Sequence, residues 1–153
     1  MADIGEIAPG APWTTADGGS ASANDHRGRK LVVYFYPKDD TSGCTNEAKD
    51  FTALLREFAK AETDIVGISR DSVKSHAKFI AKYDLEHALG SDEGGAVTEA
   101  FGVWVKKSMY GREYMGIERA TFLIGADGKI ARVWRKVKVK DHAAQVLAAA
   151  QAL

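Results

Sequence analysis

The residue best suited to chemistry is Cys44, the only cysteine among the 153 residues of the chain. It follows Thr41 and Gly43 at the point where an apolar run has ended and an amphipathic segment begins. We therefore expect Cys44 in the first turn of a helix, where unpaired backbone N–H groups and the helix macrodipole stabilise an anion. Cysteine reacts as a thiolate, so this position favours a nucleophile. A small buried hydrophobic side chain is the competing interpretation, and position alone leaves both open.

Two elements must position this cysteine. Residues 31–36 form an unbroken β-branched and aromatic run, which predicts a strand buried on both faces. Pro37 ends the run, because proline cannot donate to a central sheet ladder. From residue 42 to about residue 60 the apolar side chains recur at helical spacing and predict a helix with one apolar stripe: Phe51, Leu54, Leu55 and Phe58.

The rest of the chain alternates between strand and helix patterns. Residues 1–30 are rich in Gly, Ala, Ser and Asp and predict loops with short edge strands. Residues 103–114 are polar, basic and aromatic, and we expect a flexible loop that borders the site. The remaining pattern predicts a strand at 64–69, a helix from 71 to 83, a short helix within 91–101, strands at 119–124 and 130–134 joined by an Asp-Gly turn at 126–129, and a closing helix over 141–153.

This order of elements is β-α-β-α, then a short helix, then β-β-α. It is typical of an α/β, thioredoxin-like fold, with a central mixed β-sheet flanked by helices on both faces. The length suits a single domain over residues 1–153.

The composition narrows the function. Lysine plus arginine and aspartate plus glutamate number 21 each, so the net charge is zero and nothing indicates a nucleic-acid partner. The one basic run, residues 132–140, alternates with Val and Trp and predicts the solvated face of a strand. A single cysteine excludes an intramolecular disulfide, and neither a signal peptide nor a membrane-length apolar run is visible. We expect a soluble, cytoplasmic protein with no membrane partner.

The sequence contains no pattern typical of a metal or cofactor site. The four histidines are scattered without metal-ligand spacing: His26, His76, His87 and His142. There is no phosphate-cradling loop and no dinucleotide fingerprint. We therefore expect neither a metal nor a cofactor, and chemistry carried by amino-acid side chains alone.

Residues 34–48, Tyr-Phe-Tyr-Pro-Lys-Asp-Asp-Thr-Ser-Gly-Cys-Thr-Asn-Glu-Ala, resemble the active-site segment of peroxiredoxins. They contain the family's Pro-x-x-x-Thr-x-x-Cys signature at Pro37, Thr41 and Cys44. The most similar branch is the Q-type, or bacterioferritin comigratory protein, subfamily. The resemblance continues through residues 66–72, 76–79 and 116–124, and extends from about residue 5 to residue 147.

The resemblance implies roles for five residues. Cys44 corresponds to the peroxidatic cysteine, which attacks the peroxide O–O bond and becomes a sulfenic acid. Thr41 corresponds to the threonine whose hydroxyl holds the thiolate and the bound peroxide, and Arg119 to the arginine that faces the cysteine. Pro37 matches the proline that shields the site from water. Glu47 matches a glutamate that orients the arginine, although a first-turn glutamate favourable to the helix dipole explains it equally well.

Elementary chemistry supports an arginine in this role. Attack on a peroxide pushes negative charge onto the departing oxygen, and a fixed guanidinium stabilises that charge as it develops. Preorganised donors also hold the two oxygens in line with the sulfur. Arginine stays protonated and presents a rigid fork of donors. Without the resemblance, a surface salt bridge would be the simpler role for Arg119.

One departure from the family pattern limits the reaction. Many Q-type members have a second, resolving cysteine five residues after the first, where this chain has Lys49. The resemblance then implies a one-cysteine peroxidase that reduces hydrogen peroxide and organic hydroperoxides and depends on an external thiol: thioredoxin, glutaredoxin or glutathione. A redox-sensing or thiol-relay protein with little turnover is the alternative. Q-type relatives suggest a monomer, with a dimer as the other option.

Overall fold

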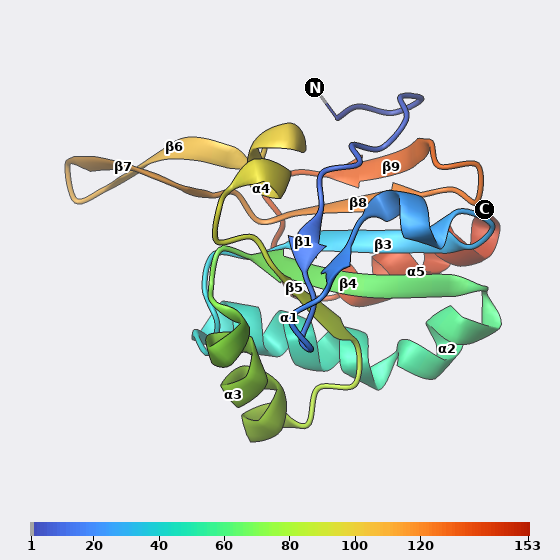
Figure 1. The fold of residues 1–153 in the computed structure, drawn as a ribbon, viewed down its shortest axis with the longest axis horizontal. Helices are drawn as coiled ribbons and strands as arrows, with labels where there is room; N and C mark the ends of the chain where they lie inside the picture. Colours follow the sequence, from blue (N-terminus) through green and yellow to red (C-terminus); the bar gives the residue numbers. More distant parts are fainter. Residues whose placement is uncertain (1) are drawn as a thin grey trace.

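The computed structural model describes residues 2–153, and its elements follow one another largely as the sequence predicts (Figure 1). In chain order they are β1 (Trp13–Thr14), β2 (Ser20–Ala21), the 3-10 helix η1 (Ala23–His26), β3 (Lys30–Phe35), α1 (Ser42–Ala53), α2 (Leu55–Lys60), β4 (Thr63–Ser69), α3 (Val73–Tyr83), β5 (Ala88–Ser91), α4 (Ala96–Ala100), β6 (Trp104–Met109), β7 (Arg112–Ile117), β8 (Ala120–Ile124), β9 (Ile130–Trp134) and α5 (His142–Ala152).

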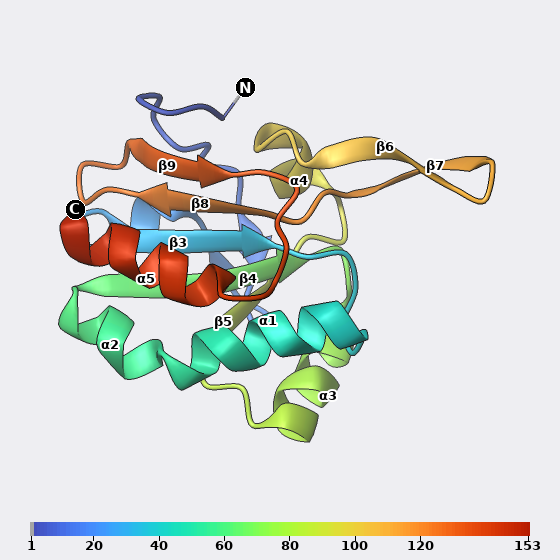
Figure 2. The same cartoon turned by 180° about the vertical axis from the view of Figure 1, so that it is seen from behind.

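The central sheet is mixed, as expected. Within residues 2–153 it contains seven strands in the order β2-β1-β5-β4-β3-β8-β9. β3, β4 and β5 run parallel, whereas β8 is antiparallel to β3 and β9 is antiparallel to β8. β6 and β7 form a separate two-stranded hairpin that projects from the body of the molecule (Figures 1 and 2).

β3 lies at the centre of this sheet and is buried on both faces, which confirms the prediction for residues 31–36. Val32, Tyr34 and Tyr36 point into one hydrophobic cluster, which also contains Cys44. Leu31, Val33 and Phe35 point into the other cluster, as the two-residue repeat of a strand requires.

Helices cover both faces, but unequally. α1, α2 and α5 lie across one face (Figure 2), and Phe79 of α3 joins their hydrophobic cluster. The other face is covered by α4, η1 and the N-terminal segment (Figure 1), which contributes Trp13 to the second cluster. The longer helices therefore lie on the first face, and Cys44 of α1 is buried in the cluster on that face.

The expected helix over residues 42–60 is interrupted. α1 ends at Ala53 and α2 begins at Leu55, because Leu54 between them has φ −100° and ψ 6°, outside the helical range. The interruption leaves Phe51 and Phe58 fully buried in the same cluster, so the apolar stripe is preserved. Periodicity reports the buried face of a segment and cannot reveal such a local change in direction.

The prediction of a flexible loop at residues 103–114 is wrong. Most of it belongs to the β6–β7 hairpin, which is joined by a tight turn at Tyr110 and Gly111 with φ of 52° and 76°. Two positive φ values in succession are typical of a type I′ turn. The hairpin is exposed on most of its surface, so it lacks the apolar alternation by which strands are predicted.

The structure also corrects two smaller predictions. β5 was not expected as a strand; it is short and contains Gly90, at which a Cβ atom would lie 2.5 Å from the Trp13 ring. The basic run was expected on the face of a strand, but β9 ends at Trp134 and residues 135–140 form a loop. The short edge strands within residues 1–30 and the turn at 126–129 are confirmed.

Candidate active site

Cys44 lies in the first turn of α1 and is 1% exposed, so both its helical position and its burial agree with the sequence. Thr41, with φ −96° and ψ 155°, is the N-cap residue that starts the helix. The first turn of a helix has backbone N–H groups without helical partners, and these stabilise negative charge on the sulfur.

Arg119 is brought to the cysteine by strand pairing. Ala120, the first residue of β8, is in register with Phe35, the last residue of β3, and α1 begins a short loop beyond β3. Arg119 immediately precedes this pair, and its Nη2 donates to the Cys44 sulfur at 3.4 Å. The guanidinium therefore faces the cysteine directly, although the two residues are 75 positions apart in the chain.

Gly43 makes room for this arginine. A Cβ atom at Gly43 would lie 3.2 Å from Arg119 Nη2, a tight contact that would displace the guanidinium by a few tenths of an ångström. Gly43 belongs to the first turn of α1, and its contact with Arg119 was not predicted from the sequence.

Glu47 lies one helical turn beyond Cys44 and fixes Arg119 from the other side. Its Oε1 accepts from Arg119 Nη1 at 2.7 Å, while Oε2 is buried without a hydrogen-bond partner in the described part of the chain. Burial raises the pKa of Glu47 from 4.5 to about 7, and the charge and hydrogen bond of Arg119 oppose that rise. The expectation of a first-turn glutamate is wrong, because α1 begins at Ser42 and its first turn contains no acidic residue. The ion pair with Arg119, rather than the helix dipole, accounts for Glu47.

The two remaining predicted residues lie in the loop before α1. Pro37 is exposed just beyond the end of β3. Thr41 is exposed as well, and its hydroxyl donates to the Lys38 carbonyl at 2.9 Å. The structure thus links Cys44, Glu47 and Arg119 directly, whereas the roles of Pro37 and Thr41 stay predictions.

Lys107 on β6 is a neighbour that the sequence did not single out. It is half-buried, and burial followed by the charge of Arg119 lowers its pKa, while Cys44 and Glu118 act in the opposite sense. The base of the hairpin therefore borders the site, as expected for residues 103–114, although as a strand. The only sequence indication was the basic character of this segment.

The loop before α1 itself carries a second buried carboxylate, Asp39. Its Oδ1 accepts from the Tyr36 hydroxyl at 2.6 Å, and its Oδ2 lies 2.7 Å from both the Ser75 hydroxyl and His76 Nδ1. His76 Nε2 in turn lies 3.1 Å from the Gly90 carbonyl oxygen. These contacts tie the loop that leads to Cys44 to α3 and β5.

Asp39, Asp71 and His76 are also close enough to hold a cation, since one ligand atom from each lies within 4.8 Å of the others. Residue spacing did not reveal this group, because its members come from separate segments. The atoms involved already have protein partners: Asp71 Oδ2 accepts from the Asp39 amide at 2.9 Å and the Ser69 hydroxyl at 2.7 Å. We interpret the group as a hydrogen-bonded anchor for the loop.

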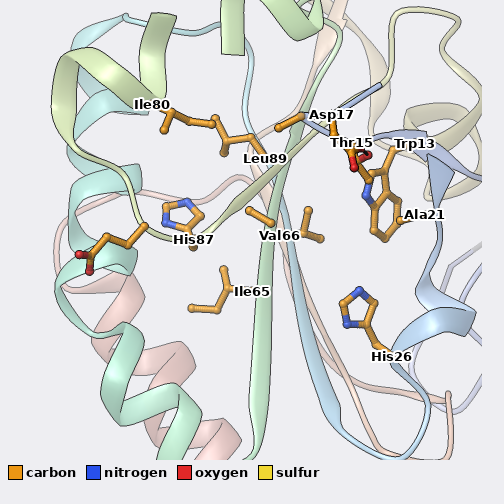
Figure 3. Close-up of a pocket in the computed structure, with 13 residues that line it drawn as sticks. Trp13, Thr15, Asp17, Ala21, His26, Ile65, Val66, Ile80, His87 and Leu89 are labelled. Carbon is orange, nitrogen blue, oxygen red and sulfur yellow. Dashed lines mark hydrogen bonds between the residues drawn. The ribbon is translucent and has the colours of Figure 1, made fainter. Parts of the chain in front are cut away.

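A cavity of about 650 Å³ lies elsewhere, along the side of the sheet that carries β1 and β5 (Figure 3). Trp13, His26, Ile80 and Leu89 are among the residues that line it. None of the five predicted site residues contributes to its lining. The residues around Cys44 thus lie away from this cavity.

Comparison with known proteins agrees with this geometry. Residues 4–133 match the AhpC/TSA family. Peroxiredoxin Bcp of Xanthomonas campestris is 50% identical over 141 residues, which cover 92% of this chain and 88% of the relative. Peroxiredoxin Bcp of Bacillus subtilis is 46% identical over 145 residues, or 95% of this chain and 92% of the relative.

Solved structures extend the likeness to the fold. The bacterioferritin comigratory protein of Xanthomonas campestris superposes with a TM-score of 0.91 at 47% identity and covers 98% of both chains. Peroxidoxin BcpB of Mycobacterium tuberculosis gives a TM-score of 0.87 at 32% identity, over 100% of this chain and 99% of the other. Within residues 2–153, no helix has the length and apolar character required to cross a membrane. The chain belongs to the AhpC/TSA family and, within it, to the Bcp or Q-type peroxiredoxins, which are thiol peroxidases.

Proposed function

We propose that this peroxidase reduces hydrogen peroxide and small organic hydroperoxides through Cys44, and that an external thiol completes each cycle. The observation that carries the proposal is the contact between Arg119 Nη2 and the Cys44 sulfur, 3.4 Å long, at the start of a helix. Alkyl peroxide reduction is described for the Xanthomonas relative, which supports organic hydroperoxides as substrates.

In the first half of the cycle the Cys44 thiolate attacks the terminal oxygen of the peroxide. A sulfur–oxygen bond forms as the O–O bond breaks, which leaves a sulfenic acid on Cys44 and an alkoxide or hydroxide that takes up a proton. The sulfur is oxidised and the peroxide is reduced. Arg119 stabilises the charge that develops on the departing oxygen, and Glu47 holds Arg119 in place through its bond of 2.7 Å.

Thr41 and Pro37 have roles in peroxide binding. The Thr41 hydroxyl donates to the Lys38 carbonyl, and rotation about its Cα–Cβ bond would turn it toward an arriving peroxide. Pro37 would limit access of water from the loop that follows β3. Both roles rest on the match to the family signature and on the position of the two residues in the loop before Cys44.

In the second half of the cycle a thiol must come from outside the chain, because Cys44 is the only cysteine in the sequence. The external thiol attacks the sulfenic sulfur, a disulfide forms, and the oxygen leaves as water. A second thiol then attacks the mixed disulfide and regenerates Cys44. Thioredoxin, glutaredoxin and glutathione all supply such thiols in the cytoplasm, where we place the protein as a monomer.

The test is rapid mixing of the reduced protein with hydrogen peroxide, with sulfenic acid formation as the readout. Wild type should react far faster than free cysteine, and the reaction should vanish in Cys44→Ser. A wild-type rate equal to that of free cysteine would falsify the proposal.

The single cysteine also supports a second candidate, a redox relay in which oxidised Cys44 forms a mixed disulfide with one partner and turns over little. The two differ in turnover. Sustained peroxide consumption with glutathione, glutaredoxin or thioredoxin supports the peroxidase, whereas a single oxidation per molecule followed by a stable mixed disulfide supports the relay.

A further inference from the structure

The loop of residues 135–140, between β9 and α5, lines a cavity of about 440 Å³ with cationic side chains. We call it the basic cavity. Its positive residues are Arg135, Lys136, Lys138 and Lys140, and none of the residues that line it is acidic. Its volume falls within the range of about 300–1,000 Å³ typical of small-molecule sites. In the sequence this segment appeared only as a basic run.

Most of the positive charge of the basic cavity is uncompensated. Arg135 is paired with Glu118, with Nε 2.7 Å from Oε2. Lys136, Lys138 and Lys140 are exposed and form no ion pair within residues 2–153. The formal net charge of the chain is zero, so this concentration of charge is a local feature.

Glu118 acts on both Arg135 and Lys136, so one carboxylate faces the four cations of the basic cavity. Burial, followed by the charge of Arg119, lowers the pKa of His142, another lining residue, to about 4, so it is neutral at physiological pH. Asp141 starts α5, but it lines a different cavity together with Asp50. That cavity lies between α1 and the start of α5, and burial and the Asp141 carboxylate raise the pKa of Asp50 there.

The basic cavity adjoins the catalytic cysteine. The Val137 amide donates to the Arg119 carbonyl at 3.0 Å, and the Arg119 side chain reaches Cys44. His142 bonds Thr121 at 2.8 Å, on the sheet face whose cluster includes Cys44. Arg119 thus contacts both the loop of the basic cavity, through its carbonyl, and the sulfur, through Nη2.

We propose that the basic cavity binds a carboxylate of the external thiol, and that this thiol is a small anionic peptide of the glutathione class. The inference rests on the proposed function, which requires a thiol from outside the chain. A tripeptide of this class spans about 10 Å when extended, so its carboxylates lie well away from its thiol and can bind at a separate cationic cavity. A cationic cavity beside the site raises the local concentration of anionic reactants and their rate of arrival.

The test separates the two halves of the cycle. The protein is first oxidised with one equivalent of hydrogen peroxide and then mixed with glutathione, which carries a net negative charge, or with neutral 2-mercaptoethanol. In the variant Lys136→Gln/Lys138→Gln/Lys140→Gln the rate constant for glutathione should fall about tenfold. The rate constant for 2-mercaptoethanol and the initial oxidation by hydrogen peroxide should not change.

A matched control removes the same amount of charge at the other end of the sheet. Arg56→Gln/Lys60→Gln/Lys129→Gln changes three exposed cations, two of which lie on α2, far from the hairpin in Figure 2. Glutathione should reduce this variant at the wild-type rate. Equal losses in the two triple variants would show an effect of total charge and would overturn the inference.

Two further outcomes would also overturn it. One is that the triple-lysine variant is oxidised more slowly by a carboxylate-bearing hydroperoxide, but not by tert-butyl hydroperoxide, and is reduced normally by glutathione. The carboxylate bound in the basic cavity would then belong to the peroxide and not to the thiol. The other is that the triple-lysine variant is reduced more slowly by a thioredoxin-type protein but at the wild-type rate by glutathione. Failure of the wild type to react with hydrogen peroxide would instead contradict the proposed function.

Discussion

Two buried carboxylates, Asp39 and Glu47, flank the loop and the first turn that carry Cys44, and their surroundings differ. Both oxygens of Asp39 have partners: the Tyr36 hydroxyl on one, and the Ser75 hydroxyl and His76 on the other. Glu47 bonds Arg119 through one oxygen and leaves the other buried and without a partner among residues 2–153.

This difference indicates that the two carboxylates have different roles, one structural and one in the reactive site. A fully hydrogen-bonded polar cluster is rigid and fixes the chain around it. A buried polar atom without a partner is costly, and a catalytic role is one established reason why a protein retains it. We interpret the Asp39 cluster as the anchor of the loop and the Glu47–Arg119 pair as part of the reactive site.

The largest effect is expected on stability, from Asp39→Ala. The change leaves Tyr36, Ser75 and His76 without their buried acceptor, and removal of one partner from a buried pair typically costs about 3–5 kcal/mol. Chemical denaturation should show a loss in this range. Exposed Glu57, which pairs with Lys60, is the control; Glu57→Ala should cost less than about 1 kcal/mol. Equal losses would remove the distinction between the cluster and an ordinary surface ion pair.

Arg119→Gln, in contrast to Asp39→Ala, should cause a large loss of reactivity toward hydrogen peroxide. Removal of a donor that stabilises charge in a transition state costs about 10²–10³-fold in rate. Rapid mixing with hydrogen peroxide measures the loss, and Arg29→Gln, on an exposed ion pair, provides a control arginine. A loss of less than about fivefold in folded Arg119→Gln would place the guanidinium outside the reaction.

Glu47→Gln tests the raised pKa of the Glu47 carboxyl group through the pH dependence of stability. Because the pKa of Glu47 is raised from 4.5 to about 7, the folded state binds its proton more tightly than the unfolded state. The resulting stability is complete below pH 4.5 and is lost as pH rises through about 7. Glutamine is neutral throughout, so the variant should gain on the order of 3 kcal/mol relative to wild type between these limits.

Denaturation curves of wild type and Glu47→Gln at pH 4.5, 6 and 8 provide the measurement. The difference in unfolding free energy should widen steadily with pH up to about 7 and then level off. A difference that stays constant across this range would mean that Glu47 has an ordinary pKa in the folded protein.

The smallest effect is expected from Gly43→Ala. The added Cβ would lie 3.2 Å from Arg119 Nη2 and displace the guanidinium slightly. We expect a loss of about threefold in the peroxide reaction, since catalysis is sensitive to small misplacements. Stability should hold or rise by up to about 1 kcal/mol, because alanine suits a helix better than glycine. An unchanged rate would show that the close approach is incidental.

The sequence anticipated most of the fold because its strong patterns are local. The apolar run at 31–36 predicts β3, and the Asp-Gly turn predicts the β8–β9 hairpin. The β6–β7 hairpin and β5 were missed, since one is largely exposed and the other is four residues long. Neither offers the apolar periodicity on which strand prediction depends.

The sequence by itself placed Cys44 at a helix start and excluded an intramolecular disulfide, and its resemblance to peroxiredoxins predicted the nucleophile and the need for an outside thiol. The tertiary structure decided which groups reach that sulfur. Arg119 arrives through the pairing of β3 with β8, Lys107 through the base of the hairpin, and the basic loop through the bond between Val137 and Arg119. The physical reason is that these contacts join segments far apart in the chain, and hydrophobic burial of the sheet sets their distances only when the whole chain folds.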